Sequence, residues 1–310
     1  MKINGLIDLH THGFGGYDTR ASAPEHILKM ARLYKRAGTD AFLPTIYPST
    51  IDDMRANMEA VKRAMQVQSS EFRVKIQNPK SKIGNSLSAV ILGVHLEGPF
   101  LNPVRCGALD KSSFIRPTLS NFKKLIYGFE DMIRIITVAP EMPGALKIIE
   151  RCSELGIKVN MGHSDATYRE ASEGMKAGST GITHIFNAMR PFHHREPGLA
   201  GFGLSEDIFI EVIADGVHIH PLALNLIFSV KKKERIILVS DSVKGAKGDG
   251  RPVYASGKML AGSGITMKNS IKVLRKIGVS GHDIGIFKSN PLRYLTKNLI
   301  FGILHLPFKS

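Results

Sequence analysis

Cysteine is scarce in this sequence: Cys106 and Cys152 are the two present among 310 residues. Two isolated cysteines form no CxxC pair and cannot supply the dense disulfide framework of a small secreted domain. We therefore expect both to be small buried or half-buried side chains in a fold that depends on its hydrophobic core.

Long apolar runs are also missing. No uncharged apolar stretch approaches the ~20 residues that a helix needs to cross a bilayer. The first ten residues, MKINGLIDLH, place an aspartate and a histidine where a signal peptide would carry its apolar core and cleavage site. Hydrophobic residues make up 43% and charged residues 22% of the chain, which is in the range of soluble globular proteins. We expect a cytoplasmic protein with no membrane partner.

Acidic residues are outnumbered by basic ones, 27 against 42, and the net charge of +15 favours anionic partners. These could be nucleic acid, a phosphorylated metabolite or an acidic protein. The longest basic run, residues 231–233, is expected to be a solvated helix C-terminus. The sequence has no zinc-finger spacing, RNP-like motif or aromatic platform for single strands, so we do not expect nucleic acid as a partner.

Eight apolar, β-rich runs alternate with helical stretches, a pattern typical of a parallel sheet. Two of the helices are expected over 24–38 and 143–156, because proline stands near their starts and glycine at their ends. Eight strands in this length fit a (β/α)8 barrel, and a doubly wound open sheet is the alternative. Polar residues at the C-terminal ends of almost every run favour the barrel, because barrel enzymes place their chemistry there. The expected strands span 5–12, 41–48, 89–99, 133–141, 158–164, 181–189, 209–219 and 235–242.

The chain is expected to divide into a barrel over 1–242 and a C-terminal helical extension over 243–310 that packs on it. Within the extension, 267–278 and 290–298 look helical, and the apolar end of the tail has no assignment. A polar insertion over 66–88 is expected to be an exposed loop or a short hairpin.

Two strands carry pairs of residues that suit a metal ion. His10 and His12 are two apart, so both point to the same face of a strand, where such a pair can bind a divalent ion such as zinc. The plainer interpretation is a pair of polar strand-end residues. His95 and Glu97 share a face of the third strand, and a buried glutamate costs several kcal/mol unless it is paired or bound to a cation.

Further polar residues end the later strands. His163 and His184 end the fifth strand and interrupt the sixth, and Asp215 and His218 follow the seventh. Asp241 ends the eighth strand, where it could act as general base for a water activated by a metal, or could merely cap the next turn. A lone histidine in such a place is usually structural, but four strands that supply His or Glu at the same end favour a metal site.

Taken together, the segments IDLHTHG, GVHLEGPFLNP, GHSDA, THIFNAMRPFHHREPGLAG, ADGVHIHP and LVSDS resemble the amidohydrolase superfamily, and within it the N-acetylglucosamine-6-phosphate deacetylases. The resemblance runs from residue 5 to about 295. It implies a TIM barrel of the metal-dependent amidohydrolase type. It also implies hydrolysis of the acetamide of N-acetylglucosamine 6-phosphate to glucosamine 6-phosphate and acetate. The galactosamine epimer is the alternative substrate.

The resemblance further implies a divalent metal cofactor, zinc or iron(II), with one or two ions per subunit. The ligands of the tightly held ion would be Glu97, His163 and His184. Some members hold a second ion through the first-strand histidines, here His10 and His12, with Glu97 as the bridge between the two ions.

Other positions match the family's catalytic and substrate-binding residues. Asp241 matches the catalytic aspartate, which accepts the proton of the attacking water and then protonates the leaving amine. Asn187, the backbone at Ala188, Arg195 and His218 match residues that bind the sugar phosphate. In family members the arginine can reach the site of a neighbouring subunit, which implies a homodimer.

The sequence also departs from the family. Leu109 stands where members usually have a histidine that faces the substrate, and we expect the small β-sandwich domain of the family to be absent or rudimentary here. Residues 296–310 match no family segment. These departures motivate a third interpretation, a truncated and catalytically impaired relative that only binds metal or sugar phosphate.

Overall fold

The computed structural model describes residues 5–77, 87–255 and 259–296, with the side chains of 72–77 excluded. Its main sheet contains eight parallel strands, each hydrogen-bonded to the next along the chain, with one short extra strand, β5 (Val90–Ile91), beside β4. In order, the eight strands are β1 (Leu6–Thr11), β4 (Thr39–Ile46), β6 (Val94–Glu97), β7 (Ile133–Val138), β8 (Lys158–Met161), β9 (Gly181–Ile182), β10 (Phe209–Ile213) and β11 (Ile236–Val239).

The sheet closes where the chain leaves β11 and returns to β1. The backbone amide of Asp241 donates to the carbonyl of His10 at 2.9 Å, and that of His12 donates to Ser242 at 2.8 Å. The expected (β/α)8 barrel is therefore confirmed, and the doubly wound open sheet is excluded because its edge strands would not meet.

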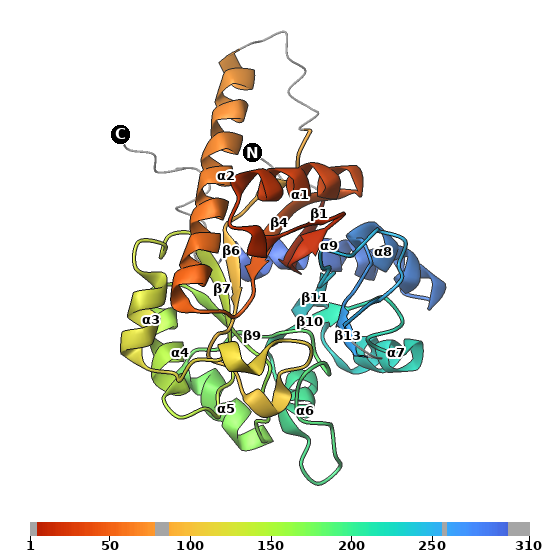
Figure 1. Cartoon of the computed structure of the whole chain (residues 1–310). Coiled ribbons are helices and arrows are strands. Elements are labelled where there is room, and N and C mark those ends of the chain that lie inside the picture. Colours follow the sequence, from red (N-terminus) through yellow and green to blue (C-terminus); the bar gives the residue numbers. More distant parts are fainter. Residues whose placement is uncertain (1–4, 78–86, 256–258, 297–310) are drawn as a thin grey trace.

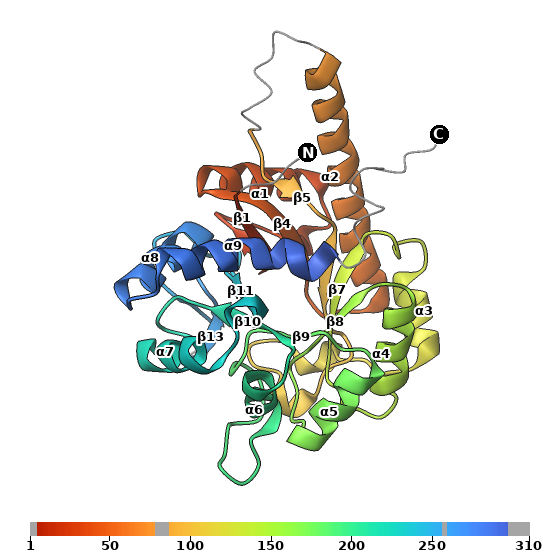
Figure 2. The same cartoon turned by 180° about the vertical axis from the view of Figure 1, so that it is seen from behind.

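Helices form an outer layer around the barrel (Figures 1 and 2). Apolar side chains that point outward from the strands pack against the inner faces of these helices and make two large clusters. The helices of this layer are α1 (Pro24–Arg36), α2 (Ile51–Gln77), α3 (Leu119–Ile126), α4 (Ala145–Glu154), α5 (Tyr168–Ala177), α6 (Gly198–Ser205), α7 (Pro221–Val230) and α8 (Met267–Lys276).

Each of the eight expected runs contains an observed strand, but most strands stop several residues early. The run 181–189 contributes two strand residues, and the run 209–219 ends its strand at Ile213. The run 89–99 is split between β5 and β6 at Gly93, whose φ of 133° favours glycine. The residues beyond the strand ends turn into the mouth of the barrel, and that is where the polar side chains lie.

The expectation of a loop or hairpin over 66–88 is wrong for 66–77, which continue α2 (Figure 1). The polar composition was misleading because Gln68 is buried and satisfies the backbone of the incoming strand. Its side-chain amide donates to the carbonyl of Ala89 at 2.8 Å and its oxygen accepts from the amide of Ile91 at 3.0 Å. Residues 78–86 of the expected loop lie outside the described residues.

Past β11 the chain forms a small hairpin, β12 (Val253–Tyr254) with β13 (Leu260–Gly262), and then α8 and α9 (Gly281–Thr296). These two helices confirm the expectation for 267–278 and for the described part of 290–298. Helix α9 lies across the N-terminal ends of the strands (Figure 2): Asn290 donates to the carbonyl of Ile236, and Tyr294 and Leu295 join the apolar cluster inside the barrel. The unassigned tail lies outside the described residues.

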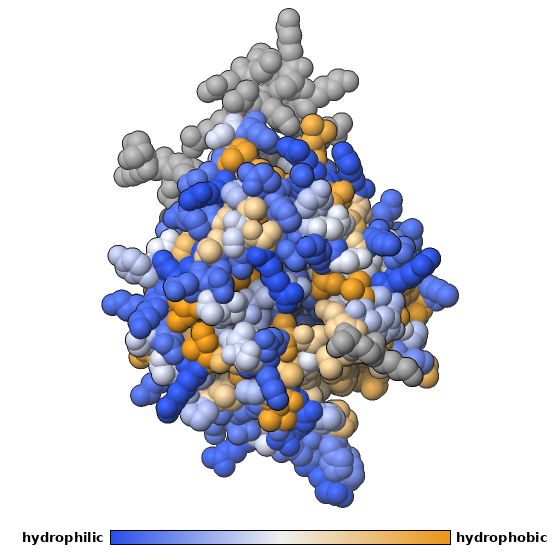
Figure 3. Space-filling model, viewed as in Figure 1, coloured by the Kyte–Doolittle hydropathy of each residue, from blue (hydrophilic) through white to orange (hydrophobic). Residues whose placement is uncertain are grey.

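Beside the barrel, the described ranges hold two two-stranded sheets, β2 (Gly13–Phe14) with β3 (Tyr17–Asp18), and β12 with β13. None of the helices in these ranges combines the length and apolar character that a bilayer crossing requires. The face seen in Figure 3 is mainly hydrophilic, with apolar side chains in small groups between charged ones.

Candidate metal centre and active site

The carboxylate of Glu97, the last residue of β6, is surrounded by imidazoles at the C-terminal mouth of the barrel. Its Oε1 lies 3.1 Å from Nε2 of His163, 3.1 Å from Nε2 of His184 and 3.3 Å from Nε2 of His10. Its Oε2 lies 3.2 Å from Nε2 of His12. All five side chains are buried. The structure therefore brings together residues from four strands that are far apart in the sequence.

This donor set suits a divalent cation. Ligand atoms of His10, Glu97 and His184 all lie within 4.8 Å of one another, and so do those of His10, His12 and Asp241. Imidazole nitrogens with carboxylate oxygens are the ligands that zinc and iron(II) take in proteins. All four imidazoles present Nε2 to the cluster.

The charge of Glu97 is maintained despite its burial. Burial alone would raise the pKa of this carboxyl, but the positive charge and hydrogen bonds of the surrounding imidazoles outweigh it and hold the pKa well below its usual range. The group is therefore an anion at neutral pH and is ready to bind a cation.

Backbone conformation aims several of these side chains into the mouth. His163, His184 and Asp241 have φ values of 46°, 25° and 47°, in the left-handed region that residues other than glycine rarely adopt. Ala188 has a φ of 48°. Each such residue costs on the order of 1–3 kcal/mol, and such strain is concentrated at functional sites. These left-handed turns could not be predicted from the sequence.

An irregularity in β1 brings both first-strand histidines inward. Ile7 and Leu9 belong to the apolar cluster inside the barrel. Strict alternation from these two would turn His10 and His12 outward. The pairing of β1 with β4 shifts register between Asp8 and Thr11, and this bulge moves the inward face by one residue.

Asp241 stands beside the cluster and is more accessible than its other members. Its Oδ1 lies 3.6 Å from Nε2 of His10 and 3.6 Å from Nε2 of His12, and its side chain is 16% exposed against 3% for Glu97. Among the described residues no backbone amide bonds to its side chain, so the alternative role as a turn cap has no support. The carboxylate is placed to exchange a proton with a water molecule or substrate at the metal position.

His95 points into the barrel below the metal cluster and is not part of it. Its Nδ1 lies 3.0 Å from the carbonyl oxygen of Leu9, and its Nε2 lies 2.9 Å from Oγ1 of Thr137. Burial, reinforced by the charge of His10, lowers the pKa of His95 to about 3. The ring is therefore neutral, and both of its nitrogens are occupied.

Glu211 was not identified from the sequence as a candidate site residue. It lies in the middle of β10, fully buried, with Oε2 2.9 Å from Nδ1 of His10. Burial would raise its pKa, but the charge and hydrogen bond of His10 lower it below the usual range. A glutamate inside an otherwise apolar strand, as in the case of Glu97, was the signal that could have found it.

The expected substrate-binding residues lie in two places. Asn187 is half-buried beside the metal cluster and donates to the carbonyl of His184 at 3.3 Å, and the carbonyl of Ala188 accepts from Ser164. Arg195 is exposed on the loop before α6, with Nη1 3.2 Å from Nε2 of His194. This loop projects from the body of the molecule (Figure 1).

His218 is fixed by its neighbour Asp215. Its Nδ1 lies 2.6 Å from Oδ2 of Asp215, whose Oδ1 accepts from the backbone amides of Val217 and His218. Burial lowers the pKa of His218, but the bond to Asp215 raises it above its usual value overall. The participation of His218, Asn187, Ala188 and Arg195 in sugar phosphate binding stays a prediction.

A buried carboxylate behind the first strand supports a prediction about pH. Oδ1 of Asp8 accepts from the amides of His10 at 3.3 Å and Ser240 at 3.1 Å, and Oδ2 has no partner among the described residues. Burial raises the pKa of Asp8 from 3.8 to about 6. The folded state therefore binds this proton more tightly than the unfolded state, and stability falls as the pH rises from about 4 to 6.

The change Asp8→Asn keeps the accepting oxygen and removes the charge. The free energy of unfolding of the variant minus that of the wild type is expected to increase by about 2.5 kcal/mol between pH 4 and pH 8. Urea unfolding at both pH values measures it. A difference that does not change with pH would contradict the raised pKa.

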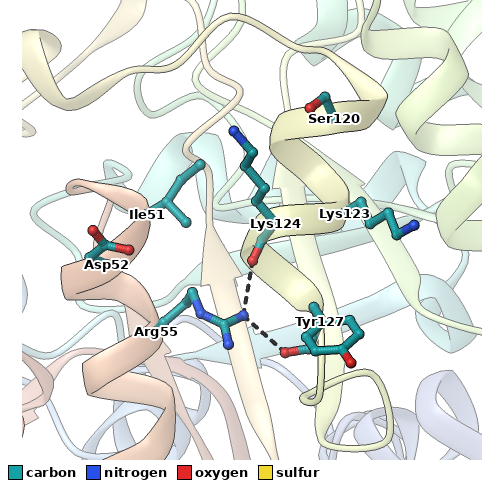
Figure 4. Close-up of a pocket in the computed structure, with 7 residues that line it drawn as sticks. All are labelled: Ile51, Asp52, Arg55, Ser120, Lys123, Lys124 and Tyr127. Atoms are coloured by element: carbon teal, nitrogen blue, oxygen red, sulfur yellow. Dashed lines mark hydrogen bonds between the residues drawn. The ribbon is translucent and has the colours of Figure 1, made fainter.

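A surface hollow between α2 and α3 lies apart from this chemistry (Figure 4). It is lined by Ile51, Asp52, Arg55, Ser120, Lys123, Lys124 and Tyr127. Arg55 is already engaged, since its Nη1 donates to the carbonyls of Lys124 and Tyr127 at 2.9 Å each. Arg55 thereby caps the C-terminal end of α3, and we assign the hollow no catalytic role.

Comparisons with known proteins agree with this geometry. No family model matches the chain. It is 38% identical over 277 residues to N-acetylglucosamine-6-phosphate deacetylase of Bacillus subtilis, a match that covers 88% of this chain and 65% of the relative. It is 33% identical over 291 residues to the enzyme of that name from Lysinibacillus sphaericus, over 89% of this chain and 70% of the relative. N-acetylgalactosamine-6-phosphate deacetylase of Escherichia coli O157:H7 is 32% identical, over 90% of this chain and 68% of the relative.

Solved structures show the same likeness. A mutant N-acetyl-D-glucosamine-6-phosphate deacetylase of Mycobacterium smegmatis, in complex with N-acetyl-D-glucosamine-6-phosphate, superposes with a TM-score of 0.82 at 26% identity, over 94% of this chain and 77% of that one. The N-acetylglucosamine-6-phosphate deacetylase of Thermotoga maritima superposes with a TM-score of 0.80 at 26% identity, over 94% of this chain and 78% of that one. The chain spans about two thirds of the length of the curated relatives.

Proposed function

This chain belongs to the N-acetylglucosamine-6-phosphate deacetylase family of amidohydrolases, and we propose that it hydrolyses the acetamide of N-acetylglucosamine 6-phosphate to glucosamine 6-phosphate and acetate. The observation that carries the proposal is the convergence of four imidazole Nε2 atoms on the Glu97 carboxylate, with Asp241 beside them. An acetamide is a poor electrophile and water is a poor nucleophile near neutral pH. A site for this reaction must therefore activate both.

The residues of the cluster fit one or two divalent ions, zinc or iron(II). Glu97, His163 and His184 would hold the first ion, and His10 and His12 would hold the second with Glu97 shared between them. Such an ion supplies Lewis acidity for the carbonyl oxygen and makes water a nucleophile near pH 7.

Asp241 performs the proton transfers of the reaction. Its carboxylate accepts a proton from the attacking water while the water oxygen bonds to the acetamide carbon. It then delivers the proton to the sugar nitrogen as the C–N bond breaks, which releases the amine and acetate. The exposure of Asp241 relative to Glu97 supports this division of roles.

The sugar phosphate would be oriented from the loops around the mouth. Asn187, the backbone at Ala188 and His218 would contact the sugar, and the planar guanidinium of Arg195 suits a phosphate dianion. The side chain of Leu109 cannot hydrogen-bond to the substrate carbonyl, so polarisation of that carbonyl would depend on the metal.

A homodimer is proposed from two exposed features. Leu222, Leu226 and Val230 repeat every four residues on α7 and are 73%, 55% and 54% exposed, which forms an apolar stripe on one helix face. Phe192 is 55% exposed on the loop that carries Arg195. A second copy of the chain would cover these apolar groups and bring its own Arg195 loop near the site.

The stripe gives a test of assembly. Leu226→Glu is expected to convert the dimer to a monomer by light scattering, because a carboxylate buried in an apolar interface is costly. Val67→Glu, an exposed apolar position on α2, is the control and should leave the dimer intact. A wild-type chain that is monomeric at micromolar concentration would refute the dimer.

The function is tested by removing and restoring the metal. Chelator-treated protein is expected to release no acetate from N-acetylglucosamine 6-phosphate, and zinc or iron(II) should restore the release. The unphosphorylated sugar is the control for recognition of the phosphate. Activity that does not depend on metal defeats the proposed mechanism, and metal binding without turnover of either epimer leaves the impaired relative as the explanation.

The galactosamine epimer is the second candidate substrate, because the Escherichia coli relative carries that name at similar identity. Comparison of kcat/KM for the two 6-phosphates decides between them. A cytoplasmic location fits a phosphorylated substrate and the two free thiols, Cys106 and Cys152, and is proposed on that basis.

A further inference from the structure

A buried polar layer lies directly beneath the metal cluster, inside the barrel. Its centre is Glu211, which is 1% exposed. Oε2 of Glu211 contacts Nδ1 of His10 at 2.9 Å and the backbone amide of His184 at 3.4 Å. One carboxylate therefore touches a residue from each of the two proposed metal positions.

The other oxygen of Glu211 is held by a chain of hydrogen bonds that leads to the far end of the barrel. Nδ2 of Asn160, on β8, donates to Oε1 of Glu211 at 2.8 Å. The hydroxyl of Tyr294, on α9, donates in turn to Oδ1 of Asn160 at 2.5 Å and lies 3.0 Å from Oγ1 of Thr180. Helix α9 is thus connected to His10 through two intervening side chains.

Gly181 shows that the space for this connection is reserved. A Cβ atom at this position would lie 2.2 Å from Oδ1 of Asn160 and 2.8 Å from the hydroxyl of Tyr294. Any side chain on β9 at this level would displace the Asn160–Tyr294 contact. The glycine keeps the path open.

The chemistry of the contact fixes the proton of His10. A carboxylate only accepts hydrogen bonds, so the proton between His10 and Glu211 belongs to Nδ1. The lone pair of the neutral ring is then on Nε2, the atom that faces Glu97 and His12 at 3.3 Å each. A histidine that binds a metal through one nitrogen and donates to a carboxylate through the other is held in the tautomer and orientation that the ion needs.

We propose that Glu211 is the positioning residue of the first-strand metal position, and that Asn160 and Tyr294 hold it from α9. The proposal rests on the proposed function only in that His10 and His12 bind an ion. It makes the affinity for that ion depend on a helix that covers the opposite end of the barrel.

The change Glu211→Gln tests the carboxylate with almost no change in shape. His10 and Asn160 contact different oxygens of Glu211, and glutamine replaces one of these oxygens with an NH2 group that cannot accept. If the NH2 group faces His10, it favours the wrong tautomer of that ring. We expect the dissociation constant of one Zn²⁺ to rise about 10- to 100-fold. The dissociation constant of the Zn²⁺ held by Glu97, His163 and His184 should change by less than about threefold, because Glu211 reaches that position only through its 3.4 Å contact with the backbone amide of His184.

The change Tyr294→Phe tests the link to α9, because it removes the hydroxyl and keeps the ring. We expect a smaller rise in the same dissociation constant. Asn290→Ala is the matched control on the same helix, since Asn290 donates to the carbonyls of Lys233 and Ile236 at 2.7 Å each, away from this chain of contacts. It should lower the melting temperature and leave Zn²⁺ affinity unchanged.

Zn²⁺ competition against a chromophoric chelator measures both constants without substrate, and the visible spectrum of bound Co²⁺ reports the ligand geometry. Unchanged dissociation constants in Glu211→Gln and Tyr294→Phe overturn the proposal, and so does an equal loss of Zn²⁺ affinity in Asn290→Ala. A wild-type chain that binds one ion also overturns it while leaving the deacetylase proposal intact. A wild-type chain that binds none defeats the proposed function itself. Should Glu211→Gln fail to fold, Tyr294→Phe decides the matter.

Discussion

Asp241→Asn is expected to lower kcat/KM for acetate release by about 10²- to 10⁴-fold, the usual contribution of a general acid and base. Asparagine cannot accept the proton of the attacking water or return one to the leaving amine. It tolerates the left-handed backbone at this position, where φ is 47°, so the loop should keep its conformation. Alanine would confound the loss of chemistry with backbone strain.

Bound metal and activity must be measured together on this variant. Glu97, His163 and His184 are unchanged in it, so the tightly held ion should remain at the wild-type level. Asp165→Asn is the control for loss of a negative charge near the mouth, because Asp165 is paired with Arg105 and Arg190 and contacts no imidazole among the described residues. Asp241 would be a ligand and not a base if metal and activity disappeared in parallel.

Glu97→Gln is expected to have a comparable effect through loss of metal. The neutral amide cannot bridge two cations, and the metal content of the purified variant should fall to the level of chelator-treated protein. Glu141→Gln is a matched control, since Glu141 accepts hydrogen bonds from Asn102, Ser164 and the amide of Asp165 and contacts no imidazole in the described structure. Metal retained at full occupancy in Glu97→Gln would disprove the assigned centre.

The same change should destabilise the metal-free chain. Removing one partner of a buried ionic cluster typically costs about 3–5 kcal/mol, because the remaining charges lose their compensation. The pKa of Glu97 is held well below its ordinary value of 4.5, so its stabilising effect is present above that pH and is lost as the pH falls through the folded-state pKa. Unfolding in the presence of chelator should therefore show a gap between variant and wild type at pH 7 that narrows on strong acidification.

Much of the candidate site was visible in the sequence. Glu97 stands in an apolar strand, where burying an unpaired carboxylate is unfavourable. His163 and Asp241 each stand at the end of an apolar run. Because parallel strands of a barrel end at the same rim, residues in this position must meet. Spacing alone predicts that these residues lie close together. The resemblance to a known family then implies a role for each of them.

Other features could not be predicted because they depend on contacts made elsewhere. The polar residues over 66–77 predicted a loop, yet Gln68 turns inward and hydrogen-bonds to the backbone of Ala89 and Ile91. Alternation within β1 placed His10 and His12 on one face, but the bulge before them decides that this face is the interior. Neither the partner of Gln68 nor the bulge in β1 can be read from the residues next to it in the sequence.

The sequence by itself determined the eight strands, the rim at which the histidines and carboxylates gather, and the charge that the site must neutralise. These follow from apolar periodicity and from the cost of burying polar groups, which are properties of short segments. The tertiary structure alone decided that His10 presents Nε2 to Glu97, with Glu211 behind it and α9 beneath, because hydrogen bonds between residues about two hundred positions apart exist only once the barrel has closed.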